Sequence, residues 1–299
     1  MTQTNSFSIV CRGCGERTEQ LVVSAIEQRF KYTAHVNGDP FEETLAKAYS
    51  KAIDLGLDYT IMIDCDVIPE YSSLFELHQF ARSLPPEHLG TSAKTADKIL
   101  GRARHVGLRI FRTRYLERLI PLIPTPGESE RPETAAHRAL EAKGFVYRKA
   151  KISCGIHGYH QWIRDLISTT CNLVKKDSSA FQSLVESARR SHDTGHTDYL
   201  AMQLGAALGS MSSTEARVSR SCKLDAIKRM MSDFGIEEKP SLQSLPPQLV
   251  VTERIRDSIA RTGPKNPSRF SKLIHRLCLS QKRSHSVVRD ADESANLTR

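Results

Sequence analysis

The feature that most constrains the fold is a regular alternation of short apolar runs and amphipathic segments between residues 7 and 64. The runs at 7–11, 32–39 and 59–64 predict strands, and the segments 17–30 and 41–55 place apolar residues at helical spacing. The third run, "YTIMID", is nearly all apolar, as expected for a central parallel strand that is covered on both faces. The alternation therefore predicts a βαβαβ unit.

The pattern after residue 64 is less regular but still contains strands and helices. We predict helices at 71–84 and 133–144, strands at 105–113 and 145–153, and a mainly helical chain beyond residue 160. The expected fold class is α/β, with a mixed, mainly parallel sheet flanked by helices and a mostly helical C-terminal region. The expected divisions are a nucleotide-binding catalytic domain, a helical region with a basic amphipathic segment, and a disordered tail, at residues 1–165, 166–289 and 290–299.

Composition favours a cytoplasmic protein that is not built on disulfides. No apolar run in the 299 residues is long enough to span a bilayer, and the N-terminus lacks the features of a secretory signal. The seven cysteines are an odd number scattered along the chain, which suits a reducing compartment. The net charge of +9 is concentrated toward the C-terminus, where it suits an anionic lipid surface or nucleic acid, or forms a solvated face.

Two aspartates close the third predicted strand, in the sequence "TIMIDCDVIP". Side chains two residues apart in an extended chain point to the same face, so Asp64 and Asp66 face one way and Cys65 the other. In an open α/β sheet, ligands bind outside the carboxyl ends of the strands. Paired carboxylates there are suitable ligands for Mg²⁺ or Mn²⁺ bound to substrate phosphates. The D-x-D pattern alone arises by chance, and its place at a strand end makes it informative.

The segment "LDYTIMIDCDVIPEYSSLFEL", with the strands and helices before it, resembles the nucleotide-sugar-binding half of a GT-A glycosyltransferase, similar in particular to family-2-like enzymes. The resemblance covers residues 6 to 165. It implies a nucleoside-diphosphate sugar as donor, a glycan, lipid-linked or small-molecule acceptor, and Mn²⁺ or Mg²⁺ held by Asp64 and Asp66. The cation would act as a Lewis acid on the departing nucleoside diphosphate.

The same resemblance implies a general base and a third metal ligand. The base is expected from an acidic residue near the start of a helix, where "GESERPE" offers Glu128, Glu130 and Glu133, although carboxylates there also suit the helix dipole. The third ligand is expected from a histidine in "ISCGIHGYHQW", namely His157 with His160 as the substitute.

Two residues are expected to contact the nucleotide, and the sequence departs from the family pattern around both. Asp39 stands in an Asn-Gly-Asp turn where an acidic pair is usual, and it could face the base or ribose. Arg12 lies in the first loop, where "CRGCGERT" replaces the usual small-residue-and-asparagine turn, and it could balance the diphosphate. The order of residues in "HQWIR" differs from the signature of processive polysaccharide synthases, and this difference, with the lack of membrane helices, argues against a synthase of that type.

Two further clusters offer alternative metal sites. A zinc site would combine the C-x-x-C of "CRGC" with the C-x-x-H of "CGIH", and its ligands would be Cys11, Cys14, Cys154 and His157. The segment "SHDTGHTDYL" (191–200) gathers histidines and aspartates, but turn and N-cap residues account for every position in it.

The C-terminal basic segment supports the rival functions. Residues 268–283 form an amphipathic pattern that could rest on the inner face of an anionic membrane or pack on the protein's own domain. A nucleic-acid-binding protein is the non-enzymatic alternative, but nucleic acid is an unlikely partner because the chain has one tryptophan and 6% aromatic residues. A nucleotidyltransferase is the third possibility, for which Gly13 and Gly15 provide a weak phosphate loop.

Overall fold

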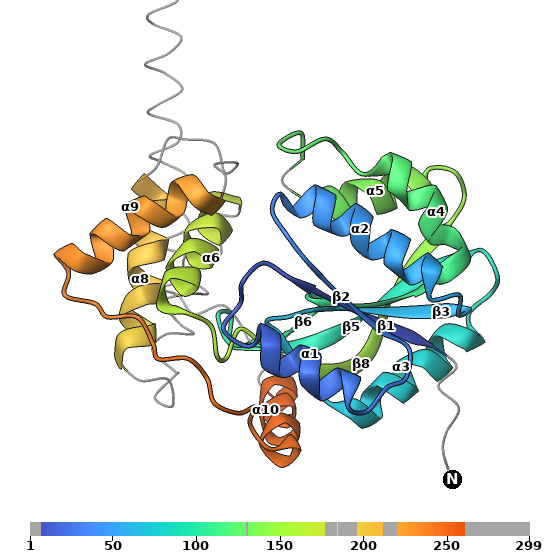
Figure 1. The fold of residues 1–299 in the computed structure, drawn as a ribbon, viewed down its shortest axis with the longest axis horizontal. Helices are drawn as coiled ribbons and strands as arrows, with labels where there is room; N and C mark the ends of the chain where they lie inside the picture. Colours follow the sequence, from blue (N-terminus) through green and yellow to red (C-terminus); the bar gives the residue numbers. More distant parts are fainter. Residues whose placement is uncertain (1–6, 130, 177–183, 185–195, 212–219, 261–299) are drawn as a thin grey trace, which may run out of the picture. The chain divides into compact units, whose positions relative to one another are not determined.

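The computed structural model describes residues 7–129, 131–176, 184, 196–211 and 220–260. At its centre lies an eight-stranded sheet in the order β2-β1-β3-β7-β5-β8-β4, with β6 paired to β5 (Figure 1). The strands are β1 Ser8–Gly13, β2 Thr33–Asn37, β3 Tyr59–Asp64, β4 Val67–Pro69, β5 His88–Asp97, β6 Arg102–Arg104, β7 Leu108–Arg112 and β8 Val146–His157.

The sheet is mixed, and most of its strands share one direction. Strand β1 pairs in parallel with β2 and β3, and β5 pairs in parallel with β8. Strand β7 lies antiparallel between β3 and β5, while β4 and β6 are antiparallel to β8 and β5. The predicted fold class, an α/β fold with a mainly parallel mixed sheet flanked by helices, is confirmed.

Helices cover both faces of the sheet (Figure 1). Apolar residues of α1, α3 and α10 pack in one cluster with the sheet, and those of α2, α4 and α5 pack in a second cluster. The helices are α1 Glu19–Glu27, α2 Phe41–Asp54, α3 Tyr71–Ser83, α4 Leu116–Leu119, α5 Pro132–Glu141, α6 Ile163–Lys176, α8 His196–Met211, α9 Arg220–Asp233 and α10 Gln248–Ala260, with short 3-10 turns η1 Thr113–Tyr115 and η2 Ile120–Leu122.

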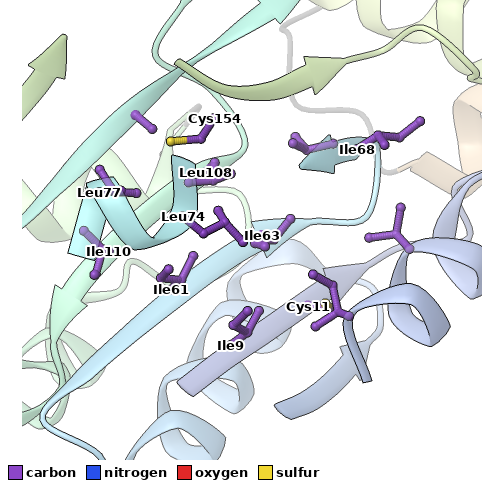
Figure 2. Close-up of a cluster of buried hydrophobic side chains, with 14 of the residues drawn as sticks. Ile9, Cys11, Ile61, Ile63, Ile68, Leu74, Leu77, Leu108, Ile110 and Cys154 are labelled. Carbon is purple, nitrogen blue, oxygen red and sulfur yellow. The ribbon is translucent and has the colours of Figure 1, made fainter. Parts of the chain in front are cut away.

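The first cluster fixes the strand that carries the aspartate pair. Ile61 and Ile63 of β3 are fully buried between Ile9 of the neighbouring β1 and Leu74 of α3 (Figure 2). Burying each such side chain contributes about 1.5–3 kcal/mol. Because apolar contacts on the strand are this extensive, the position of the polar residues at its end is well defined.

Helices α6, α8 and α9 form a third cluster. Helix α6 packs closely on α8, where a Cβ on Gly205 would meet Thr170 Oγ1 and a Cβ on Gly209 would meet the Cys171 carbonyl oxygen. No helix in the described residues is long and apolar enough to cross a membrane. The domain boundary after residue 165 stays a prediction, and the predicted tail at 290–299 lies outside the described residues.

The elements from residue 65 onward differ most from the prediction. Strands β4, β5 and β6 were not expected, because β5 ("HLGTSAKTAD") carries too many polar residues for a buried strand. Strand β8 was expected to end at residue 153 but continues to His157, since it pairs there with β4 and β5. The strand predicted at 105–113 is shorter, as β7 covers Leu108–Arg112.

Candidate active site

The candidate site lies where the carboxyl ends of β1, β2 and β3 meet at one edge of the sheet. The register pairs Arg12 of β1 with Asp64 of β3, and the Gly38 amide after β2 donates to the Gly13 carbonyl oxygen at 3.3 Å. The chain passes from β1 to β2 on one side and returns to β3 on the other. A reversal of this kind opens a crevice at the strand ends where ligands bind in α/β sheets.

The first half of the site is an ion-pair network around Asp64. Arg12 donates from Nε and Nη2 to Asp64 Oδ1, at 2.9 and 2.6 Å, and from Nη1 to Glu133 Oε1 at 3.1 Å. Arg109 of β7 reaches the other oxygen of Glu133 at 2.8 Å. The Asp64 side chain remains 30% exposed, whereas that of Arg12 is 2% exposed. Burial raises the pKa of Asp64, and the nearby Asp66 adds to this while Arg12 opposes it.

The second half is a chain of polar contacts that begins at Asp66. Its Oδ2 atom lies 3.1 Å from His157 Nε2 and accepts from Gln161 Nε2 at 3.0 Å. His157 Nδ1 lies 2.9 Å from Asp97 Oδ2, which also accepts from Arg104 Nε at 2.6 Å. Burial opposes ionisation of Asp66, but His157 and Gln161 hold its pKa below its usual range. Asp66 and Asp97 likewise outweigh the effect of burial and raise the pKa of His157 to about 10.

The residues around Asp66 fit a divalent cation in their chemistry. Asp66 Oδ1 is buried and has no hydrogen-bond partner among the described residues. Gly107, at φ +69°, lets the backbone pass close to the site, because a Cβ there would clash with Val67 Cγ2 and would lie 3.4 Å from His157 Cδ2 and 3.5 Å from Asp64 Oδ2. Carboxylate and imidazole ligands, with the far imidazole nitrogen held by a second carboxylate, are a common metal-binding arrangement. In the described part of the chain, no three His, Cys, Asp or Glu side chains are arranged so that together they could hold a metal ion.

The other predicted residues lie in different settings. Asp39 is exposed just after β2, at the same edge of the sheet. Glu128 is exposed in the loop before α5, where its Oε2 accepts from the Thr125 amide at 2.9 Å. Glu130 lies outside the described residues. His160 does not approach Asp66 but lines a separate cavity with Lys98.

Arg12 and Glu133 are placed in a way that opposes their predicted roles. The guanidinium of Arg12 is engaged by two carboxylates, so it is already neutralised and cannot turn freely toward a diphosphate. Glu133 is 5% exposed, and although burial opposes ionisation, Arg109 and Arg12 lower its pKa to about 2. A carboxylate with so low a pKa is a weak proton acceptor near neutral pH. Glu133 is suited instead to holding Arg12 against Asp64.

The alternative zinc site is not assembled. Cys11 and Cys154 are buried, and Cys154 Sγ donates to the Ser73 carbonyl oxygen at 3.4 Å. Cys14 Sγ donates to the Gly38 carbonyl oxygen at 3.4 Å, and His157 faces the two aspartates described above. Cys14, Cys154 and His157 therefore each have a different partner.

The remaining clusters are described only in part. In the 191–200 segment, Asp198 is buried and ion-paired with Lys98 and Lys239, while residues 191–195 lie outside the described residues. The basic segment 268–283 also lies outside them.

Asp97 and Gln161 were missed as members of the site. Asp97 ends an unpredicted strand, and the register that sets it beside His157 links residues 60 positions apart. Gln161 belongs to the quoted "GYHQW" run, whose place after a strand is the one signal that could have drawn attention to it.

Comparisons with known proteins add structural likenesses at low identity. No family model matches the sequence, and a search of curated proteins also finds no match. A mannosyltransferase from Pyrobaculum calidifontis, in complex with GDP-mannose and Mn²⁺, is 12% identical with a TM-score of 0.36, over 83% of this chain and 79% of that one. The catalytic domain of Drosophila β1,4-galactosyltransferase 7, in complex with xylobiose, is 15% identical with a TM-score of 0.33, over 50% and 67%.

A third likeness is to a CMP-2-keto-3-deoxy-manno-octonic acid synthetase in complex with CTP, at 12% identity and a TM-score of 0.34, over 50% of this chain and 90% of that one. At these values the likenesses do not bear on activity. The sheet and helices described above form a mixed α/β arrangement, which is the fold class that the sequence predicted.

Proposed function

We propose that the protein is a metal-dependent glycosyltransferase that moves a sugar from a nucleoside-diphosphate sugar to an acceptor. The observation that carries the proposal is the pairing of Asp66 with His157 beside Asp64, at the carboxyl end of β3. Asp64 and Asp66 carry like charges, and Asp66 Oδ1 is buried without a hydrogen-bond partner among the described residues. A bound cation would stabilise both carboxylates. A glycan, a lipid-linked sugar or a small molecule would serve as acceptor.

The proposed metal ligands are Asp66, His157 and Asp64, with Mn²⁺ or Mg²⁺ as the ion. Metal binding would displace the Nε2 proton that His157 shares with Asp66 in the free protein. When bound, the ion supplies a Lewis acid that stabilises negative charge on the leaving nucleoside diphosphate. Asp97 accepts from His157 and orients its ring so that Nε2 faces Asp66. Arg12 orients Asp64 in a similar way. It donates two hydrogen bonds to Asp64 Oδ1, which leaves Oδ2 available to the ion.

The nucleotide and acceptor ends of the site use exposed acidic residues in this proposal. Asp39, exposed after β2, would accept hydrogen bonds from the ribose or base of the donor. Glu128 is the proposed general base, since it is exposed in the loop before α5, whereas Glu133 is neutralised by two arginines. A base must be able to reach the acceptor and take up its proton.

The loop after β1 argues against a nucleotidyltransferase. Phosphate loops present backbone amides to the ligand. Here the Cys14 amide donates to Glu16 Oε2 at 2.6 Å and the Gly15 amide donates to Glu19 Oε2 at 2.7 Å. Both amides are therefore occupied by carboxylates, which also repel a triphosphate.

A thermal-shift panel of UDP-, GDP-, CMP- and dTDP-sugars, with and without Mn²⁺, tests the proposal. We expect one nucleotide class to raise the melting temperature only when Mn²⁺ is present, because binding to the native state stabilises it. The response should disappear in Asp64→Ala/Asp66→Ala and persist in Asp54→Ala, which changes an exposed aspartate at the end of α2. No response to any nucleotide, with salt-sensitive binding to RNA or DNA instead, would favour the nucleic-acid-binding rival.

A further inference from the structure

A polar cavity of about 450 Å³ lies beside the candidate site and is not used by the proposed function. Its lining includes Arg17 before α1, Lys98 after β5, Lys239 before α10 and Arg254 within α10. The lining also contains Asp198, together with Glu237 and Glu238. Four cationic side chains from separate parts of the chain therefore line one cavity that is partly open to solvent.

The two lysines share a single carboxylate. Lys98 pairs with Asp198 Oδ2, and Lys239 Nζ lies 2.5 Å from Asp198 Oδ1. One carboxylate cannot neutralise two ammonium groups, so a positive charge remains at this point. Lys98 is 4% exposed, and burial lowers its pKa to about 8 although Asp198 favours the charged form.

The two arginines have no carboxylate partner among the described residues. Arg17 donates from Nε and Nη2 to the Pro240 carbonyl oxygen, at 2.9 and 2.7 Å. The Arg254 guanidinium lies over the Tyr159 ring, 4.7 Å from its centroid. Neither contact neutralises the guanidinium charge. Both contacts do hold the groups in place, which favours binding of an anion by reducing the freedom lost on association.

The other acids of the lining offset these charges only in part, and Glu237 is exposed to solvent. Glu238 accepts from the backbone amide of Ile163 at 2.6 Å and pairs with Arg164 at 3.7 Å, so its charge is engaged at the start of α6. The pKa of His160 reflects the positive charge of the cavity. Burial and the neighbouring cations, with Lys98 first among them, lower the pKa of His160 to about 4. The cavity is therefore an electropositive environment.

The cavity is joined to the candidate site by one short turn. The Lys98 amide donates to the His157 carbonyl oxygen at 3.1 Å, and Lys98 Nζ donates to the Tyr159 carbonyl oxygen at 3.2 Å. Two residues after Tyr159, Gln161 donates to Asp66. Residues 158–161 thus contact the candidate metal ligand on one side and the cavity on the other. A ligand in the cavity would lie within a short reach of the site.

We propose that this cavity binds a phosphoryl group carried by the acceptor. A phosphate monoester carries between one and two negative charges at neutral pH and offers several oxygens to converging donors. It therefore suits a lining with four cations better than a ligand with one carboxylate group does. The volume also exceeds that of a phosphate alone, so part of the molecule bearing it would fit. The role in acceptor binding rests on the proposed function, whereas the phosphate site itself does not.

The test is a ³¹P NMR titration of inorganic phosphate against the full-length protein in buffer with EDTA, so that no metal bridges phosphate to Asp66. We expect saturable binding to the wild type that weakens roughly tenfold in Arg254→Gln, because one charge-assisted hydrogen-bond donor is lost. Arg256→Gln is the matched control, since Arg256 lies on the same helix and is exposed outside the cavity lining. Arg17→Gln, at a half-buried residue of another element, should weaken binding in the same way.

Two further arms identify the source of the phosphoryl group. Glycerol 3-phosphate should compete with inorganic phosphate if the acceptor is soluble, whereas competition by phosphatidic acid vesicles alone would indicate a lipid-linked acceptor. Acetate at equal concentration should not compete. The inference is overturned if phosphate does not bind, if acetate competes equally, or if Arg254→Gln binds phosphate as tightly as the control Arg256→Gln does.

The outcome is separable from that of the proposed function. Nucleotide-sugar binding with Mn²⁺ but no response to phosphate would overturn only the phosphate site. A phosphate response without any nucleotide-sugar binding would support the phosphate site and remove its assignment to an acceptor.

Discussion

His157 Nε2 lies 3.1 Å from Asp66 Oδ2, and this contact joins the last residue of β8 to the turn after β3. The two residues are brought together by the antiparallel pairing of β4 with β8. The second nitrogen of the same ring is held by Asp97 of β5. Three strands thus fix the orientation of one imidazole relative to one carboxylate.

Replacing Asp97 by asparagine should weaken Mn²⁺ binding by 10–100-fold, the usual effect of changing a residue that orients a metal ligand. Asp97 accepts from the Leu100 amide, Arg104 and His157, and an amide side chain keeps only one of its two acceptor oxygens. A titration followed by the EPR signal of free Mn²⁺ measures this effect. Asp54→Asn, on the exposed end of α2, is the control. Equal Mn²⁺ affinity in a folded Asp97→Asn protein would remove Asp97 from the site.

Replacing Glu133 by glutamine should lower the free energy of unfolding by about 3 kcal/mol, because Arg12 and Arg109 would lose the carboxylate that they share. Urea denaturation at pH 7 provides the measurement. Glu128→Gln, at an exposed residue, should change stability by less than about 0.5 kcal/mol. If Glu133→Gln were as stable as the wild type, the buried network would not hold Asp64 as described.

Replacing Gly107 by alanine should reduce both stability and Mn²⁺ affinity. Its φ is +69°, its Cβ would meet Val67 Cγ2, and the added methyl group would occupy the space beside Asp64 and His157. Gly144→Ala is a matched control, because Gly144 has φ +89° but nothing within 4 Å of a Cβ. Both variants should lose about 1–2 kcal/mol from the backbone conformation. Only Gly107→Ala should bind Mn²⁺ more weakly, and equal Mn²⁺ binding in the two would contradict the site.

Acid sensitivity should depend on His137, which stacks on Tyr147 with ring centroids 4.5 Å apart. Burial lowers the pKa of His137 to about 4, although Glu133 opposes this. Because the pKa is lower in the folded state than in the unfolded state, the stability contribution is complete above about pH 6.5 and is lost as the pH falls toward 4. The loss should reach about 2 kcal/mol at pH 4.5.

His137→Phe keeps an aromatic ring and should remove most of this loss. Denaturation curves at pH 7 and pH 4.5, for the wild type and the variant, give the comparison. An unchanged difference between the two pH values would show that other groups cause the acid sensitivity.

The first three strands and the aspartate pair could be predicted from the sequence because local pattern determines them. Apolar residues fill "YTIMID", and β3 covers the predicted residues Tyr59–Asp64. Strand β5 could not be predicted in this way. Its Thr91, Thr95 and Asp97 are buried, and their burial is possible because neighbouring strands and side chains supply partners that a local pattern does not reveal.

The roles of the site residues depended on the same distant contacts. His157 was expected near Asp66 from its place in the resemblance, and the two are in contact. The ion pair between Arg12 and Glu133 was not expected, because it joins residues 121 positions apart that have no shared local motif. A charged residue therefore gives a candidate for chemistry, whereas its partners decide whether the charge is available.

The most direct test of the account is isothermal titration calorimetry of UDP and GDP, with and without Mn²⁺, for the wild type and Asp66→Asn. Removing one charged ligand should weaken a metal-bridged complex without changing contacts to the base or ribose. We predict that Mn²⁺ raises the affinity of the wild type for one nucleotide at least tenfold, about 1.4 kcal/mol, and leaves that of Asp66→Asn unchanged. An equal Mn²⁺ effect in both proteins, or none in the wild type, would contradict a metal at Asp66.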